Sequence, residues 1–68
     1  MNLSDFDDYQ VAQGIRKWVD EENKDDFDTE FVDNMLERLE NGYELTANQS
    51  SGLRNIVIGF EIDLHQYV

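Results

Sequence analysis

Cysteine and proline are missing from the 68-residue sequence, and basic residues are scarce, with 5 Lys or Arg against 16 Asp or Glu. Without cysteine, the sequence offers no disulfide, zinc knuckle or thiol chemistry. Nucleic-acid binding needs Lys or Arg at the phosphates, so a formal charge of −11 argues against direct contact with nucleic acid. The same charge argues against an anionic membrane surface as a partner.

Long apolar runs are also missing. The longest run, Ile56-Val57-Ile58, is too short to span a membrane or to form a secretory signal, so we expect a cytoplasmic protein. Hydrophobic residues nevertheless make up 40% of the chain, which is more than a disordered acidic tail contains. The sequence therefore predicts one folded domain over residues 1–68 with an unusually negative surface.

A first helix is predicted to begin after the capping residue Ser4 and to end within residues 20–23. Ser4 and Asp7 form an S-x-x-D variant of the capping box. Four apolar residues then recur at helical spacing and predict its buried face: Val11, Ile15, Trp18 and Val19.

A second helix is predicted to begin near Asp26 or Asp28, either of which is a good N-cap residue, and to end before Asn41. Gly42 follows at the position where a left-handed residue commonly ends a helix. The predicted apolar stripe of this helix consists of Phe27, Phe31, Val32, Met35, Leu36 and Leu39.

A third helix is predicted from Thr46, because Thr46 and Gln49 form a T-x-x-Q capping box, and it should run to about Phe60. Its apolar face is predicted to consist of Leu53, Ile56, Val57 and Phe60. Alternating apolar residues from Ile56 to Leu64 also fit a strand, so residues 61–68 are open to three interpretations: a last helical turn, an extended arm, or a strand added to a partner. The predicted fold is all-α, a three-helix miniature domain with a short C-terminal tail.

The negative charge is concentrated in the first two thirds of the chain. Residues 1–44 hold 14 acidic and 4 basic residues, whereas residues 45–68 hold 2 and 1. In the second helix, acidic residues recur at i, i+4, i+7, i+11 and i+14 and predict one charged stripe: Asp26, Glu30, Asp33, Glu37 and Glu40. Further acidic residues just before that helix are expected to support the stripe: Asp20, Glu21, Glu22 and Asp25.

Two interpretations of this stripe compete. A solvent-facing side of a helix is normally charged, and an acidic bias aids solubility. However, exposed helices usually intersperse both signs of charge, and like charges at i,i+4 destabilise a helix by about 0.2–0.5 kcal/mol per pair. We therefore expect the stripe to imitate the phosphates of a nucleic acid and to attract a basic nucleic-acid-binding protein.

Metal binding and catalysis are disfavoured. The EF-hand pattern requires Gly at the sixth position, where this sequence has Asp25 or Phe31, so no metal site or other cofactor is expected. His65, the single histidine, is three residues from the end of the sequence, which is a poor place for a catalytic base. We predict that the protein is not an enzyme.

Residues 27–58 resemble a helical hairpin found in small phage and mobile-element proteins. The resemblance consists of an aromatic residue, a helix, a glycine turn at Gly42, and an L-[ST]-x-x-Q opening formed by Leu45, Thr46 and Gln49. It implies a phage-like context, hence the cytoplasm of a host cell, and no catalytic residues. Together with the charge, it suggests an inhibitor of the DNA-mimic type, in the anti-restriction, anti-CRISPR or anti-nuclease class.

The alternative function is a protein interaction or assembly module that uses apolar surface. In that case the chain would form a homodimer or dock onto a partner, and the acidic residues would only keep it soluble. The residues predicted to make this contact are Ile58, Ile62, Leu64 and Tyr67.

Overall fold

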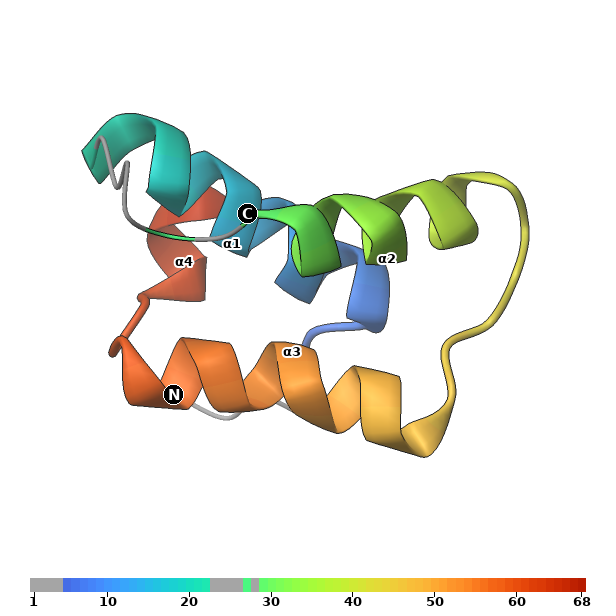
Figure 1. Ribbon diagram of the computed structural model, residues 1–68. Helices are drawn as coiled ribbons and strands as arrows, with labels where there is room; N and C mark the ends of the chain where they lie inside the picture. The colour runs from blue at the N-terminus through green and yellow to red at the C-terminus, as the bar shows by residue number, and fades with distance from the viewer. Residues whose placement is uncertain (1–4, 23–26, 28) are drawn as a thin grey trace.

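The computed structural model describes residues 5–22, 27 and 29–68, and in these residues it contains helices and no strand (Figure 1). The helices are α1 Asp8–Glu22, α2 Glu30–Glu40, α3 Ala47–Gly59 and the single-turn helix α4 Leu64–Tyr67. The predicted all-α fold with three main helices is confirmed. The C-terminal tail, for which the sequence left three possibilities, forms a short helix.

α1 begins three residues later than predicted, because its cap is Asp7. The Asp7 carboxylate accepts a hydrogen bond from the Gln10 N–H at 2.8 Å, and the Gln10 side-chain oxygen accepts one from the Asp7 N–H at 3.0 Å. This reciprocal pair is a complete capping box. Gln10, at the third position of this box, has a side chain long enough to reach back to the capping residue. In the predicted box the third position was held by Asp7, whose side chain is one methylene shorter. Ser4 lies outside the described residues.

α2 also begins later than predicted, at Glu30. Its N-cap is Thr29, whose side chain makes no capping hydrogen bond, whereas Asp26 and Asp28 lie outside the described residues. Phe27 therefore precedes the helix instead of belonging to its apolar stripe. Its ring packs against the Trp18 ring at a centroid distance of 5.8 Å and against the Phe60 ring at 5.4 Å, so tertiary contacts determine its position.

The end of α2 is the predicted glycine turn. Gly42 has a φ of +87°, in the left-handed region. The Tyr43 N–H donates to the Arg38 carbonyl at 2.9 Å and the Gly42 N–H to the Leu39 carbonyl at 3.1 Å, which are the two bonds of a Schellman motif. The turn directs the chain into the segment 41–46, which leads to α3 (Figure 1).

α3 has the predicted capping box at its start. The Thr46 hydroxyl accepts from the Gln49 N–H at 3.1 Å, and the Gln49 side-chain oxygen accepts from the Thr46 N–H at 2.9 Å. The helix ends in a second Schellman motif, in which the Ile62 N–H donates to the Val57 carbonyl at 3.0 Å. Here the left-handed residue is Glu61, with a φ of +54°.

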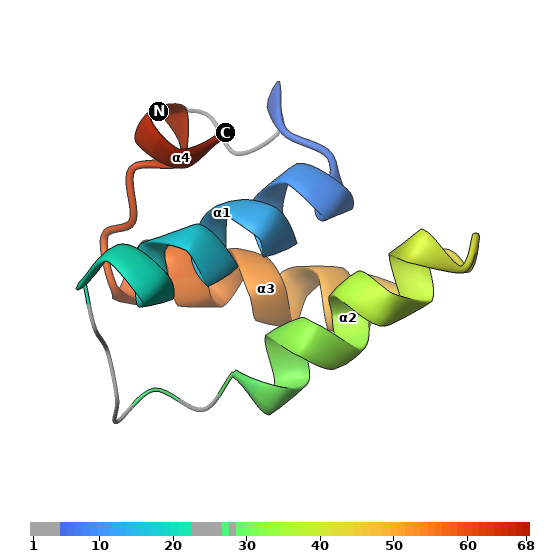
Figure 2. The same ribbon diagram turned by 90° about the horizontal axis from the view of Figure 1, so that it is seen from above.

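α1 is the central helix of the molecule. α2, α3 and α4 each pack against it, and they contact one another less (Figure 2). Most of the predicted apolar positions are buried, but Phe31 and Phe60 are partly exposed. The Phe31 ring lies against Gly52 of α3, and the Phe60 ring packs on Trp18 of α1 at a centroid distance of 5.4 Å. The buried core consists of Phe6, Val11, Ala12, Ile15, Trp18, Val19, Val32, Met35, Leu53, Val57, Ile62, Leu64 and Tyr67.

A half-buried polar cluster connects the start of α1 with α3. The Asp8 carboxylate accepts a hydrogen bond from the Ser50 hydroxyl at 2.7 Å and pairs with the Arg54 guanidinium at 3.1 Å. Arg54 also donates to the Phe6 carbonyl at 3.1 Å. Arg54, the single charged residue of α3, therefore finds its ion-pair and hydrogen-bond partners within the fold.

The tail residues belong to the core, so the predicted docking surface is wrong. Ile62, Leu64 and Tyr67 are buried by α4 packing on α1, where Gly14 lets the Leu64 side chain approach closely. An extended arm or an added strand would expose all three side chains to water, which opposes both of those interpretations. Of the four residues predicted to dock, Ile58 alone is exposed.

Candidate functional site

Five exposed acidic residues of α1 and α2 form the candidate site, which we call the acidic face: Asp20, Glu30, Asp33, Glu37 and Glu40. The four members on α2 are spaced at i, i+3, i+7 and i+10, so they lie on one side of that helix. The buried residues Val32 and Met35 are on its other side, packed into the core. The predicted separation of acidic and apolar sides on α2 is therefore correct.

Arg16 joins the α1 and α2 parts of the acidic face. Its guanidinium lies 3.0 Å from the Asp20 carboxylate, one turn further along α1, and 3.3 Å from the Asp33 carboxylate of α2. Arg16 was not among the predicted site residues. The i,i+4 spacing of Arg16 and Asp20 was the available signal, but the contact with Asp33 depends on how the two helices pack.

The remaining predicted acidic residues do not all lie on this face. Burial and the charges of Glu22, Glu21 and Asp63, in that order, raise the pKa of the Tyr67 phenol above its usual range. Glu21 and Glu22 therefore lie toward α4, whereas Asp20 lies toward α2. Asp25 and Asp26 are outside the described residues. Among the described residues, the predicted acidic set is divided between two sides of α1.

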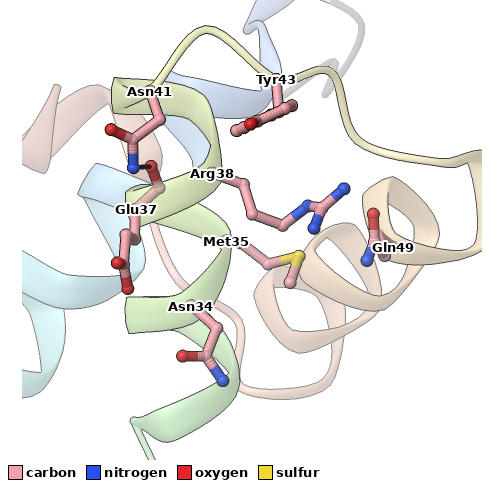
Figure 3. A pocket seen from close by; sticks show the side chains of 7 residues that line it. All are labelled: Asn34, Met35, Glu37, Arg38, Asn41, Tyr43 and Gln49. Carbon is pink, nitrogen blue, oxygen red and sulfur yellow. Dashed lines mark hydrogen bonds between the residues drawn. The ribbon is translucent and has the colours of Figure 1, made fainter.

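Arg38, the basic residue of α2, has no ion pair with the acidic face in the described part of the chain. The residue is on the side of α2 nearer to α3, and its guanidinium carbon lies 5.7 Å from the centroid of the Tyr43 ring (Figure 3). Tyr43 is 63% exposed, so it is a surface residue and not part of the core. The relief of repulsion in the row comes instead from Arg16.

The outer side of α3 differs sharply from the acidic face. Its exposed residues are uncharged: Ala47, Asn48, Ser51, Asn55, Ile58 and Gly59. Ile58 is 64% exposed, and Phe60, which caps the helix, is 54% exposed. The described surface thus has one strongly negative side and one neutral side with an apolar end.

Among the described residues, no three His, Asp or Glu side chains are grouped so that they could hold a metal ion. His65 takes part in α4 as its backbone N–H donates to the Asp63 carboxylate at 3.1 Å. Its ring packs edge-on against Phe6 at a centroid distance of 5.1 Å. No helix in the described part of the chain is long and apolar enough to cross a membrane.

Comparison of the chain with protein-family models, with curated proteins and with solved structures finds no match in any of the three. The resemblance to a phage-type hairpin stays a prediction. The acidic face is therefore the structural basis for the proposed function.

Proposed function

We propose that the protein is a small acidic inhibitor of the phage type that binds a basic nucleic-acid-binding protein in place of nucleic acid. The anti-restriction, anti-CRISPR and anti-nuclease classes are the natural subclasses. The observation that carries the proposal is the acidic face, where five carboxylates are exposed together and Arg16 pairs with two of them, Asp20 and Asp33.

The spacing of these carboxylates is compatible with the imitation of a phosphate backbone. Ten residues separate Glu30 from Glu40, which corresponds to about 15 Å along the helix axis. A nucleic-acid strand places about four phosphates over that distance, at about 3.4 Å per nucleotide. A groove lined with Lys and Arg would therefore meet a comparable density of negative charge.

The long-range field supports the same proposal. A net charge of −11 on a chain this small accelerates its encounter with a basic surface and makes binding strongly dependent on ionic strength. The buried Val32 and Met35 anchor α2 in the core, and Arg16 of α1 contacts Asp33 of α2, so two packed helices present the carboxylates. Rigid presentation lowers the entropy lost on binding.

The test is a pull-down from a bacterial lysate treated with nuclease, using the tagged protein and washes of increasing salt concentration. We expect a basic nucleic-acid-binding protein that is released by moderate salt. Reversal of Glu30, Asp33 and Glu37 to Lys should weaken this binding by about 100-fold or more, because each attraction becomes a repulsion. Circular dichroism should show that the variant keeps its helices.

A matched control separates the acidic face from net charge. Replacing Glu21, Glu22 and Glu61 with Lys changes the formal charge by the same amount, from −11 to −5, but on residues outside the acidic face. The control should retain most of the binding. Equal losses in the two variants would mean that only total charge matters, and full binding by the first variant would refute the proposal.

A second candidate function, an interaction or assembly module, is favoured by the exposed apolar end of α3. Ile58 and Phe60 are large apolar residues next to an uncharged helix side, where two copies of the chain could meet with little charge repulsion. In this case the pull-down should recover a salt-resistant partner or the protein itself as a homodimer. Replacing Ile58 with Ser should abolish that contact, whereas the variant with Lys in place of Glu30, Asp33 and Glu37 should retain it.

A further inference from the structure

An open hollow of about 440 Å³ lies between the C-terminal half of α2 and the start of α3. Its lining includes Met35, Glu37 and Arg38 from α2, Tyr43 from the connecting segment and Gln49 from α3 (Figure 3). None of these residues except Glu37 belongs to the acidic face. The hollow thus borders the acidic face at Glu37 and is otherwise lined by residues outside that face.

The Arg38 guanidinium is the cationic group of this hollow. Arg16 and Arg54 each contact a carboxylate, whereas Arg38 has no ion pair with any residue in the described part of the chain. Instead it lies near the face of the Tyr43 ring, as Figure 3 shows. A cation–π contact of this kind restrains the side chain and leaves its N–H donors available to a ligand.

Gln49 adds a second, oriented donor. The Gln49 side-chain oxygen accepts a hydrogen bond from the Thr46 N–H at 2.9 Å as part of the capping box. The capping bond therefore leaves the amide nitrogen, which can only donate, for a ligand in the hollow (Figure 3). A guanidinium and an amide N–H₂ on facing elements together favour an anionic oxygen ligand.

We propose that this hollow is a carboxylate-binding site that accepts an Asp or Glu side chain of a protein partner. The planar fork of an arginine matches a carboxylate in a bidentate arrangement, and Met35 supplies apolar surface for the methylene groups of the ligand. Glu37 in the lining opposes a doubly charged phosphate more strongly than a singly charged carboxylate. Arg and Tyr are also the residue types that dominate protein interfaces. The inference does not depend on the acidic face.

The test is an NMR titration of the side-chain Nε–Hε signals of the three arginines with sodium acetate as the probe. The Arg38 signal should shift in a saturable way, with half-saturation on the order of hundreds of millimolar, because one exposed ion pair contributes no more than about 1 kcal/mol. The Arg16 and Arg54 signals are internal controls, since both side chains already contact carboxylates. Sodium chloride at equal ionic strength should leave the Arg38 signal nearly unchanged.

Two variants make the test specific. Gln49→Glu retains the capping box, because T-x-x-E caps a helix as T-x-x-Q does, but it places a carboxylate beside Arg38. This variant should lose the acetate response while keeping its helices. Arg38→Lys keeps the positive charge but loses the planar guanidinium, and with it the stacking on Tyr43 and the bidentate contact. This variant should bind acetate several-fold more weakly. The backbone amide signals of residues around the hollow would measure this binding.

Three results would overturn the proposal. An Arg38 signal that does not respond to acetate would do so, as would equal shifts of all three arginines, which would indicate only an ionic-strength effect. A stronger response to inorganic phosphate than to acetate at the same pH would show that the ligand class is wrong.

Discussion

At the scale of single residues, Gly42 and Glu61 occupy equivalent positions in the two Schellman motifs. Both have positive φ values, +87° and +54°, and both follow the C-cap of a helix. For a residue with a Cβ, the left-handed conformation costs roughly 1–2 kcal/mol relative to the right-handed one. Gly42 avoids this cost, whereas Glu61 bears it so that Ile62 can enter the core.

The first stability prediction compares these two positions. Gly42→Ala should lower the free energy of unfolding by about 1 kcal/mol, because alanine adds a Cβ in the left-handed region. Glu61→Gly should raise it by up to about 1 kcal/mol for the converse reason. Urea unfolding followed by circular dichroism measures both. Shifts of the same sign would show that backbone conformation does not dominate at these positions.

At the scale of elements, the contact of α4 with α1 determines the conformation of the C-terminal segment. A single helical turn has no stability of its own in water. α4 is held by Leu64 and Tyr67, which are buried against α1, and by Asp63, whose side chain caps the turn. A Cβ at Gly14 would lie 2.5 Å from the Leu64 side chain and 3.2 Å from that of Val68.

The second stability prediction uses two helical glycines. Gly14→Ala should lower the melting temperature by roughly 4–8 °C, because displacing the buried Leu64 costs more than the gain in helix propensity of about 1 kcal/mol. Gly59→Ala is the control, since a Cβ there meets nothing within 4 Å, and it should raise stability by about 0.5 kcal/mol. If both variants were stabilised, the close approach of α4 to α1 would be in doubt.

At the scale of the whole molecule, the net negative charge destabilises the folded state, and it is also the basis of the proposed function. Sixteen acidic residues on a chain of 68 repel one another in the folded state, and the ion pairs of Arg16 and Arg54 relieve this repulsion only locally. Exposed ion pairs contribute about 0–1 kcal/mol each. Screening by salt should therefore stabilise this protein.

The third stability prediction follows from that repulsion. Raising sodium chloride from about 0.01 M to 0.5 M shortens the Debye length from about 30 Å to less than 10 Å. If screening recovers about 1 kcal/mol, the melting temperature should rise by about 4–8 °C. The control with Lys at 21, 22 and 61 should show a smaller rise. A melting temperature that falls with salt would mean that attractive ion pairs outweigh repulsion.

Local patterns in the sequence predicted those features of the fold that depend on neighbouring residues. The capping box of Thr46 and Gln49 and the left-handed Gly42 are correct because hydrogen bonds within a few residues determine both. The start of α1 was predicted at the wrong cap because two overlapping capping patterns, one from Ser4 and one from Asp7, compete in the sequence. Gln10 decides between them by closing the box of Asp7.

The sequence by itself determined that the chain is acidic, free of cysteine and all-α, and that α2 separates an acidic side from an apolar one. Composition and helical periodicity are properties of the chain alone. Only the tertiary structure decided that Arg16 joins Asp20 to Asp33, that Glu21 and Glu22 lie toward α4, and that the tail enters the core. Each of these three features depends on how helices distant in sequence pack on α1. Burial of apolar surface selects that packing, and the spacing of residues along the chain does not specify it.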